Sequence, residues 1–346
     1  MIGMDLRSCT EKECIELAVS LSQKPFRGKQ LFEWIHKKQA ESVQEMTNLP
    51  AAFREQLEKQ HILSGVTELA RRVSGRGDTA KYLFGLSDGS RIESVWMKYR
   101  HGNSVCISSQ VGCRMGCRFC ASTLSGLARD LTPGEMLSQV YEIQRSLGER
   151  ISHVIVMGMG EPLDNYQNLI KFIRLLSDPK GLCIGQRNIT VSTCGLVEKI
   201  RDLMEEKLQI TLAISLHAPN DEVRKKIMPV ANRYSMDEIF DVCRDYVSAT
   251  GRRITFEYSM IRGVNDSARQ AAELARRCSG LNCHVNLIPL NEVSERDCRR
   301  SAHADIANFK NVLEKNGINV TIRREMGSDI EAACGQLRRA FDLEIQ

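Results

Sequence analysis

The sequence predicts an α/β protein, with a partial (β/α) barrel preceded by a small helical region and a short antiparallel β segment. Three observations lead to this prediction. From residue 104 onward, segments rich in Ile and Val alternate with helical patterns, which is typical of parallel strands joined by crossover helices. About six such units are present, fewer than the eight of a closed barrel. Residues 1–100 lack this alternation.

Residues 1–60 are predicted to form a helical domain, because apolar residues recur at helical spacing in the segments CIELAVSL and LFEWI. In residues 61–100 the pattern changes to short alternating segments. The stretches SGRGDT and SDGS supply the Gly and Asp that turns require on either side of YLFGL. We therefore expect an antiparallel β-hairpin that extends a main domain at residues 101–346.

The main domain is predicted from its alternating elements, and no internal repeat interrupts the series. The predicted strands are SVCISS, HVIVMG, NITVST, ITLAISLH, RITFEYSMI, CHVNLIP and NVTIRR. The predicted helices are TPGEMLSQVYEIQRSLG, NLIKFIRLL, a segment that begins at Leu196, MDEIFDVCRDYVSAT, ARQAAELARRC and ADIANFKNVLEKNG. Each helix would return the chain to the start of the next strand, so the strands should be parallel.

Composition is that of an ordinary globular protein, with 42% hydrophobic and 26% charged residues among 346. No apolar stretch approaches the roughly 20 residues of a membrane span. The start, MIGMDLRSCTEKEC, lacks the apolar run of a secretory signal, so we expect a cytoplasmic protein. The net charge of +5 permits a phosphate-bearing partner without demanding one.

Thirteen cysteines are present, an odd number, and a disulfide framework is not expected in a reducing compartment. Metal or redox chemistry is the leading explanation for part of the set. The isolated cysteines are interpreted as small buried hydrophobes or surface residues: Cys9, Cys14, Cys183, Cys194, Cys243, Cys278, Cys283 and Cys298.

The strongest motif is a loop that places Cys113, Cys117 and Cys120 directly after the strand SVCISSQ. A zinc site would normally recruit a fourth Cys or His at a similar short spacing, and none follows nearby. Three thiolates on a four-iron cube leave one iron open, which the amino and carboxylate groups of S-adenosylmethionine (SAM) can chelate. With Phe119 before the last cysteine, this loop resembles the defining loop of radical SAM enzymes; zinc and structural cysteines are the alternatives.

Polar residues follow several predicted strands, at the edge where ligands bind in α/β barrels. In MGMGEP, Gly160 would allow close approach to the backbone and Glu161 would accept from an ammonium group. This segment resembles the GGE-type segment that holds the SAM amino group, although a plain strand-ending turn is about as plausible. For His217 a structural role is as plausible as ligand contact. The expected SAM-binding residues are Gly160, Glu161, Ser192, Ser215, Leu216, His217 and Asn291.

The chain resembles the bacterial dual-specificity rRNA/tRNA adenine methyltransferases along nearly its whole length. The matching segments are FRGKQLFEWI, RIESVWMKY, QVGCRMGCRFCAST, MGMGEPLDNY, ISLHAPN, CHVNLIPLN and TIRREMGSDIEAACGQLRR. The resemblance implies a partial (β/α)6 radical SAM barrel, a [4Fe-4S] cluster and SAM as cofactors, and methylation of adenine carbon 2. The implied substrates are 23S rRNA, in the peptidyl transferase region, and tRNA, at an adenosine beside the anticodon.

Three further site residues come from this resemblance. It implies that Cys334 is methylated by one SAM, that a radical derived from a second SAM activates this methyl group, and that a protein–RNA crosslink forms. Cys106 would release the product while a disulfide forms with Cys334. Glu93 corresponds to the family's proton acceptor. From spacing alone, two buried thiols that never meet would be favoured for Cys106 and Cys334, and a solvent-facing acid is nearly as plausible for Glu93.

Other interpretations stay open at this point. A related enzyme that methylates carbon 8 of adenosine shares the three-cysteine loop and both outer cysteines. Another radical SAM function, such as glycyl-radical activation, or an RNA-binding protein with structural zinc would not need Cys106 and Cys334. We expect a monomer that takes electrons from a donor such as flavodoxin or ferredoxin, with residues 1–60 gripping the RNA. The basic pairs that would assist are Arg71-Arg72, Arg252-Arg253, Arg323-Arg324 and Arg338-Arg339.

Overall fold

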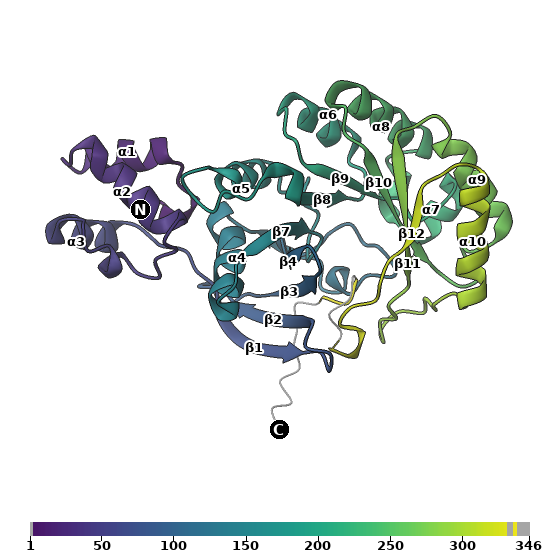
Figure 1. Cartoon of the computed structure of the whole chain (residues 1–346), viewed down its shortest axis with the longest axis horizontal. Coiled ribbons are helices and arrows are strands. Elements are labelled where there is room, and N and C mark those ends of the chain that lie inside the picture. Colours follow the sequence, from purple (N-terminus) through teal and green to yellow (C-terminus); the bar gives the residue numbers. More distant parts are fainter. Residues whose placement is uncertain (1–2, 331–334, 338–346) are drawn as a thin grey trace.

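The computed structural model of the chain describes residues 3–330 and 335–337 (Figure 1). Three helices form a separate lobe at the amino-terminal end of the molecule, and a curved sheet with helices along its outer side forms the rest. Cys334, the expected methyl carrier, lies outside the described residues. None of the helices in the described part is long and apolar enough to cross a membrane.

The amino-terminal lobe contains α1 (Glu11–Ser20), α2 (Pro25–His36) and α3 (Ala51–Gln60), as the helical periodicity predicted. Thr10 and Glu13 form a capping box at the start of α1, in which each side chain accepts a hydrogen bond from the backbone of the other. Gly28 allows α1 and α2 to pack closely, since a Cβ atom there would stand 2.3 Å from the Cα of Ile15. The buried apolar residues of the lobe are continuous with the core of the barrel.

Two buried side chains attach this lobe to α4 (Pro133–Leu147) of the barrel. Arg7 donates hydrogen bonds to the Ser138 hydroxyl at 2.8 Å and to the carbonyl of Ala40 at 2.8 Å. His36 contacts the Tyr141 hydroxyl through Nδ1 at 2.9 Å and the Cys9 carbonyl through Nε2 at 3.1 Å. Burial lowers the pKa of His36 to about 3, so the ring is neutral and donates from Nε2.

A ten-stranded sheet runs through the molecule in the order β1-β2-β3-β4-β7-β8-β9-β10-β11-β12. The first four strands pair antiparallel, and the pairs from β4 onward are parallel. The antiparallel segment has three strands, not the expected hairpin, and continues the barrel sheet. The strands are β1 (Thr67–Val73), β2 (Thr79–Gly85), β3 (Arg91–Tyr99), β4 (Gly102–Ile107), β7 (Ile151–Val156), β8 (Ile189–Thr193), β9 (Thr211–Ser215), β10 (Ile254–Met260), β11 (Cys283–Pro289) and β12 (Val320–Ile322).

The predicted partial barrel is confirmed, because helices return the chain between the parallel strands and cover their outer face (Figure 1). Two features were not predicted: the short helix α7, and a two-stranded sheet of β5 (Gln110–Gly112) and β6 (Leu127–Asp130). The helices after α4 are α5 (Tyr166–Ser177), α6 (Val197–Glu205), α7 (Asp221–Ile227), α8 (Met236–Thr250), α9 (Ala268–Cys278) and α10 (His303–Lys315).

Candidate cluster and SAM site

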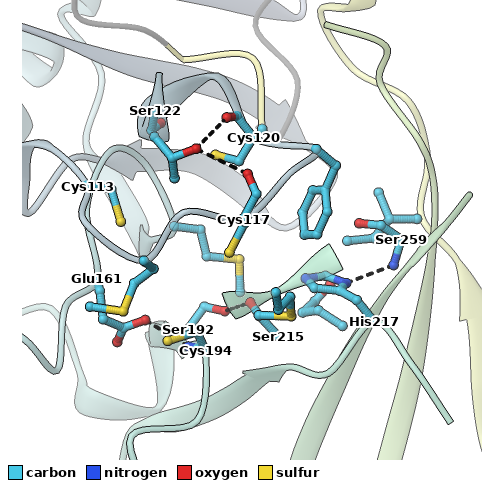
Figure 2. Close-up of a pocket in the computed structure, with 18 of the residues that line it drawn as sticks. Cys113, Cys117, Cys120, Ser122, Glu161, Ser192, Cys194, Ser215, His217 and Ser259 are labelled. Atoms are coloured by element: carbon cyan, nitrogen blue, oxygen red, sulfur yellow. Dashed lines mark hydrogen bonds between the residues drawn. The ribbon is translucent and has the colours of Figure 1, made fainter. Parts of the chain in front are cut away.

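A cavity that is partly open to solvent lies at the carboxyl ends of the parallel strands. Figure 2 shows the three cysteines of the predicted cluster loop on one side of this cavity and strand-end residues on the other. Ligand sites in α/β barrels lie at this edge, because the loops that follow the strands meet there. The expected residues in its lining are Gly160, Glu161, Ser192, Ser215, His217, Asn291, Cys113, Cys117 and Cys120.

The cysteine loop is held in shape by backbone contacts. Gly112, at the end of β5, has φ +79°, and a Cβ atom there would stand 1.9 Å from the carbonyl oxygen of Gly126. Only glycine therefore lets the two sides of the loop approach. The Thr123 hydroxyl donates to the carbonyls of Cys117 at 3.1 Å and Cys120 at 3.0 Å. The three thiols are thereby turned toward one volume.

Of the three cysteines, Cys113 is buried, and Cys117 and Cys120 are half-buried. Burial raises the pKa of Cys113 to about 12 and also raises the pKa of Cys117 and Cys120. Among the described residues, no three His, Cys, Asp or Glu side chains are gathered around a point that could hold a single metal ion. The thiolates of a four-iron cluster bind separate iron atoms, so such spaced donors fit a cluster.

Glu161 is buried in the cavity wall and positioned by the backbone. Its carboxylate accepts hydrogen bonds from the amides of Cys194 at 2.7 Å and Leu163 at 3.0 Å. Burial raises its pKa, and the bond from Cys194 opposes this rise. A carboxylate has lone pairs for about four hydrogen bonds, so both oxygens can still accept from an ammonium group. The preceding Gly160 has φ +104° and packs against Gln110, where a Cβ atom would be 2.6 Å from the Gln110 Cβ.

The ends of β8 and β9 bring three further predicted residues together. The hydroxyls of Ser192 and Ser215 lie 3.2 Å apart. His217 adopts a left-handed backbone with φ +57° and accepts a hydrogen bond at Nδ1 from the Ser259 amide at 2.9 Å (Figure 2). Burial lowers its pKa to about 3, so a neutral ring carries its proton on Nε2. The ring of His217 packs edge to face against the ring of Phe119, with 4.9 Å between the two ring centres.

Leu216 differs from the other expected SAM-binding residues. Its side chain is fully buried in the core and does not line the cavity. Its carbonyl accepts a hydrogen bond from Arg224 at 3.2 Å. Any contact that it makes with a ligand would therefore come from its backbone.

Cys106 lines a second pocket, which joins the first. The two pockets share Met157, Ile288, Asn291 and Arg323 in their walls. Arg323 also lines a third, outer groove together with Arg324. The three spaces therefore adjoin one another, and Cys106 lines the middle one.

The chain that flanks Cys334 contacts the cysteine loop. Gly335 lines the first cavity and accepts a hydrogen bond from the Ala121 amide at 2.7 Å. Leu337 lines the second pocket, and its carbonyl accepts from the Ser122 hydroxyl at 2.7 Å. No two cysteines of the described chain form a disulfide; the expected Cys106–Cys334 pairing involves a residue outside it and stays a prediction.

Glu93 lies on β3, two residues from Val95, which pairs with Cys106 across the strands. Glu93 and Cys106 therefore share one face of the sheet. The interpretation of Glu93 as a solvent-facing acid is wrong, because its side chain is fully buried and forms an ion pair with Lys81 at 3.2 Å. Glu93 does not line the three pockets described above.

Four residues near the site were not predicted. Cys194 and Glu257 line the cavity, Arg224 lies buried behind it, and Lys81 pairs with Glu93. Cys194 stands directly beyond the end of β8, which is the signal that identified Ser192 and Ser215, whereas Glu257 lies in the middle of β10. The sequence had assigned Cys194 to the isolated cysteines, because its closeness to Cys117 depends on the pairing of distant strands.

Comparisons with known proteins identify the family of the chain. The Radical SAM superfamily model matches residues 107–275. A model of the ribosomal RNA large subunit methyltransferase N-terminal domain matches residues 4–63. A crystal structure of a radical SAM methyltransferase from Sphaerobacter thermophilus superposes with a TM-score of 0.94 and 43% identity, over 97% of this chain and 100% of that one. The fold and site define a radical SAM methyltransferase.

Two curated relatives make the family more specific. A protein from Lachnospira eligens is 58% identical, over 99% of this chain and 97% of the relative, and one from Lachnoclostridium phytofermentans is 57% identical, over 98% and 95%. Both are named probable dual-specificity RNA methyltransferase RlmN. The chain belongs to this dual-specificity RNA methyltransferase family. It is a radical SAM enzyme that uses a [4Fe-4S] cluster and SAM.

Proposed function

We propose that this RNA methyltransferase adds a methyl group to carbon 2 of adenosine, in 23S rRNA and in tRNA. The observation that supports a carried methyl group is the position of the Cys106 pocket, which shares lining residues with the cavity of the cysteine loop. The resemblance around MGMGEPLDNY and VNLIPLN favours carbon 2 over carbon 8. Simple methyl transfer would need SAM and a nucleophile alone. A second thiol beside the radical site is what a covalently carried methyl group requires.

In this proposal Cys113, Cys117 and Cys120 hold the cluster, and Glu161 accepts from the SAM amino group. When bound, the cluster and SAM supply a 5′-deoxyadenosyl radical that can abstract an unactivated hydrogen atom. His217 offers an Nε2 proton to the cavity, and Ser192 and Ser215 offer hydroxyls. The remaining SAM contacts are assigned to Gly160, the backbone of Leu216, and Asn291, which lines both inner pockets.

Carbon 2 of adenine is electron-poor and cannot attack SAM directly, so the methyl group needs a carrier. We assign this role to Cys334, whose thiolate would take a methyl group by displacement. Gly335, which follows it in the chain, lines the cavity. Cys106 then frees the product from the carrier as its thiol joins the sulfur of Cys334 in a disulfide, which a reductant later opens.

Glu93 is assigned as the acceptor of the proton that adenine loses. Its support is the shared sheet face with Cys106 and its ion pair with Lys81, which favours an ionised carboxylate. Lys81 therefore holds Glu93 in the state that can take a proton.

The RNA has to present an unstacked base to the inner pocket. The outer groove that contains Arg323 and Arg324 offers an entry, since arginine suits phosphate recognition. On the helical lobe, Phe26 is 46% exposed, with the guanidinium of Arg27 4.6 Å from its ring centre. An exposed aromatic beside a cation suits contact with RNA bases and phosphates. The electron donor, the monomeric state and a cytoplasmic location stay predictions from the sequence.

Mass spectrometry of the digested RNA tests the position of methylation. Adenosine-containing RNA would be treated with the reconstituted enzyme, SAM and reductant, then digested and compared with 2-methyladenosine and 8-methyladenosine standards. We expect 2-methyladenosine, with loss of label from RNA deuterated at carbon 2. A product that elutes as 8-methyladenosine would contradict the proposal and favour the carbon-8 alternative.

A further inference from the structure

Arg224, on α7, is a fully buried cation behind the cavity wall. Its side chain donates to the carbonyls of Cys194 at 2.6 Å, Leu216 at 3.2 Å and Ser215 at 3.4 Å. These carbonyls belong to the segments that follow β8 and β9. The guanidinium thus touches the backbone of the site but is absent from the cavity lining.

The charge of Arg224 is not neutralised by any carboxylate in contact with it. Within the described residues no Asp or Glu lies at ion-pair distance from Arg224, and its Nη1 has no hydrogen-bond partner. Asp221, on the same helix, acts on its charge only from a longer distance. A buried ion without a counter-ion is costly, so buried charges are normally paired. Three neutral carbonyls do not supply the missing negative charge.

The helix that carries Arg224 lies against the cysteine loop. The amide of Arg118, next to Cys117, donates a hydrogen bond to the carbonyl of Ile227 on α7 at 2.9 Å. Cys194, whose carbonyl accepts from Arg224, lines the same cavity as Cys117 and packs in the same apolar cluster. Arg224 therefore lies behind the part of the cavity wall that faces the proposed cluster ligands.

The geometry points to Arg224 as the residue that compensates the negative charge of the cluster. From behind the cavity wall, Arg224 stabilises the bound cluster and its thiolates. It also makes the one-electron reduction of the cluster more favourable. This inference rests on the proposed assignment of the cluster to Cys113, Cys117 and Cys120. Such a cluster with three thiolates is net negative, and reduction by an external electron donor makes it more negative by one unit. A fixed cation nearby stabilises the reduced state more than the oxidised state.

The test is the extent of cluster reduction at one fixed solution potential, measured by electron paramagnetic resonance on the anaerobically reconstituted holoenzyme. Arg224→Gln and Arg224→Met remove the charge, whereas Arg224→Lys keeps it and loses the planar fork. Lys226→Gln, on the same helix but 62% exposed at its side chain, removes an equal charge at the surface and serves as the control. The SAM dissociation constant is measured alongside.

We expect the ratio of reduced to oxidised cluster to fall about tenfold or more in Arg224→Gln and Arg224→Met, which is 59 mV for a one-electron couple. Arg224→Lys and Lys226→Gln should stay close to the wild type, and SAM affinity should be unchanged. Loss of the cluster from the two neutral variants, with retention in Arg224→Lys, would also support a role for the charge.

Four results would overturn the inference. The first is a ratio of reduced to oxidised cluster that is unchanged in the two neutral variants. The second is the same change of this ratio, or the same loss of the cluster, in all three Arg224 variants, because the effect would then come from the carbonyl contacts and not from the charge. The third is weaker SAM binding with an unchanged ratio of reduced to oxidised cluster, because the charge of Arg224 would then stabilise bound SAM and not the cluster. A wild-type protein that binds no iron would overturn the inference together with the proposed cluster site, whereas the other results leave that site intact.

Discussion

The ammonium nitrogen of Lys81 lies 3.2 Å from a carboxylate oxygen of Glu93, and both side chains are buried in the sheet next to Cys106. Two opposite charges removed from water stabilise each other, because each one offsets part of the cost of burying the other. This pair connects the stability of the antiparallel segment with the proposed catalytic role of Glu93.

The first prediction concerns this pair. Lys81→Met should lower the free energy of unfolding by about 3–5 kcal/mol, because it leaves a buried carboxylate without its partner. Glu93→Gln should reduce turnover by roughly 100-fold or more while SAM binding is retained, as expected for a lost proton acceptor. Urea denaturation and single-turnover assays measure the two effects.

The controls for this pair come from the same strands. The double variant Lys81→Met/Glu93→Gln should regain much of the lost stability, since neither charge remains. Lys98→Met, on β3 with its side chain 54% exposed, should change stability by less than about 1 kcal/mol. If Lys81→Met and Lys98→Met lower the free energy of unfolding equally, the buried pair contributes no more to stability than an exposed ion pair does.

The second prediction concerns the cluster ligands. Cys113→Ala, Cys117→Ala and Cys120→Ala should each lose iron and abolish formation of 5′-deoxyadenosine, because the cluster needs all three thiolates. Cys183→Ser changes an exposed cysteine that does not line the cavity, so this variant should keep its iron and still form 5′-deoxyadenosine. Normal 5′-deoxyadenosine formation in the three loop variants would contradict the site.

The third prediction separates SAM binding from cluster binding. Glu161→Gln and Asn291→Ala should weaken SAM binding about tenfold or more without loss of iron, because each removes a polar contact at the cavity wall. Asn282→Ala, at an exposed position before β11, is the control. Equilibrium binding to the holoenzyme measures this, and a dissociation constant equal to that of the control would remove the residue from the SAM site.

The fourth prediction uses the pH dependence of His36, whose pKa burial lowers to about 3. Between this value and the unfolded value of about 6.5, the unfolded chain binds a proton that the folded chain does not. The contribution of His36 to the free energy of unfolding is therefore fully present above pH 6.5 and declines as the pH falls toward 3.

The measurement compares urea denaturation of the wild type and His36→Gln, which cannot take up that proton. From pH 7.5 to pH 5.5 the wild type should lose about 1.4 kcal/mol more than the variant. Other groups, His217 included, titrate in both proteins and cancel in the difference. Identical pH profiles would mean that His36 is not held neutral between Tyr141 and Cys9.

Much of the fold could be predicted because local patterns and tertiary packing agree. The segment MDEIFDVCRDYVSAT coincides with α8 (Met236–Thr250), which a Ser235 capping box begins and Gly251 in a left-handed conformation ends. The segment CHVNLIP coincides with β11. By contrast, α7 is short and highly charged, so its sequence DEVRKKI has little apolar periodicity.

The candidate site was predictable where residues adjoin strand ends, and less so where distant elements determine the environment. Alternation on β3 suggested that one face meets solvent, yet Ser94 packs against Gln139 of α4 while Glu93, on the opposite face, is also buried. Both faces of this strand are covered, which no single-strand pattern can reveal. Arg224 was missed for a similar reason, since its role depends on carbonyls from two other segments.

The proposed carrier and resolving thiols can be tested together by denaturing electrophoresis of enzyme purified from cells, with and without ribonuclease. The Cys106→Ala enzyme should accumulate RNA covalently attached through Cys334, because addition to adenine proceeds and release fails. Mass spectrometry of the ribonuclease-treated band should find an adenosine bridged by one carbon to the Cys334 peptide, and Cys106→Ala/Cys334→Ala should carry no RNA. Normal turnover by Cys106→Ala without any adduct, or unimpaired RNA methylation by Cys334→Ala, would contradict the carrier mechanism.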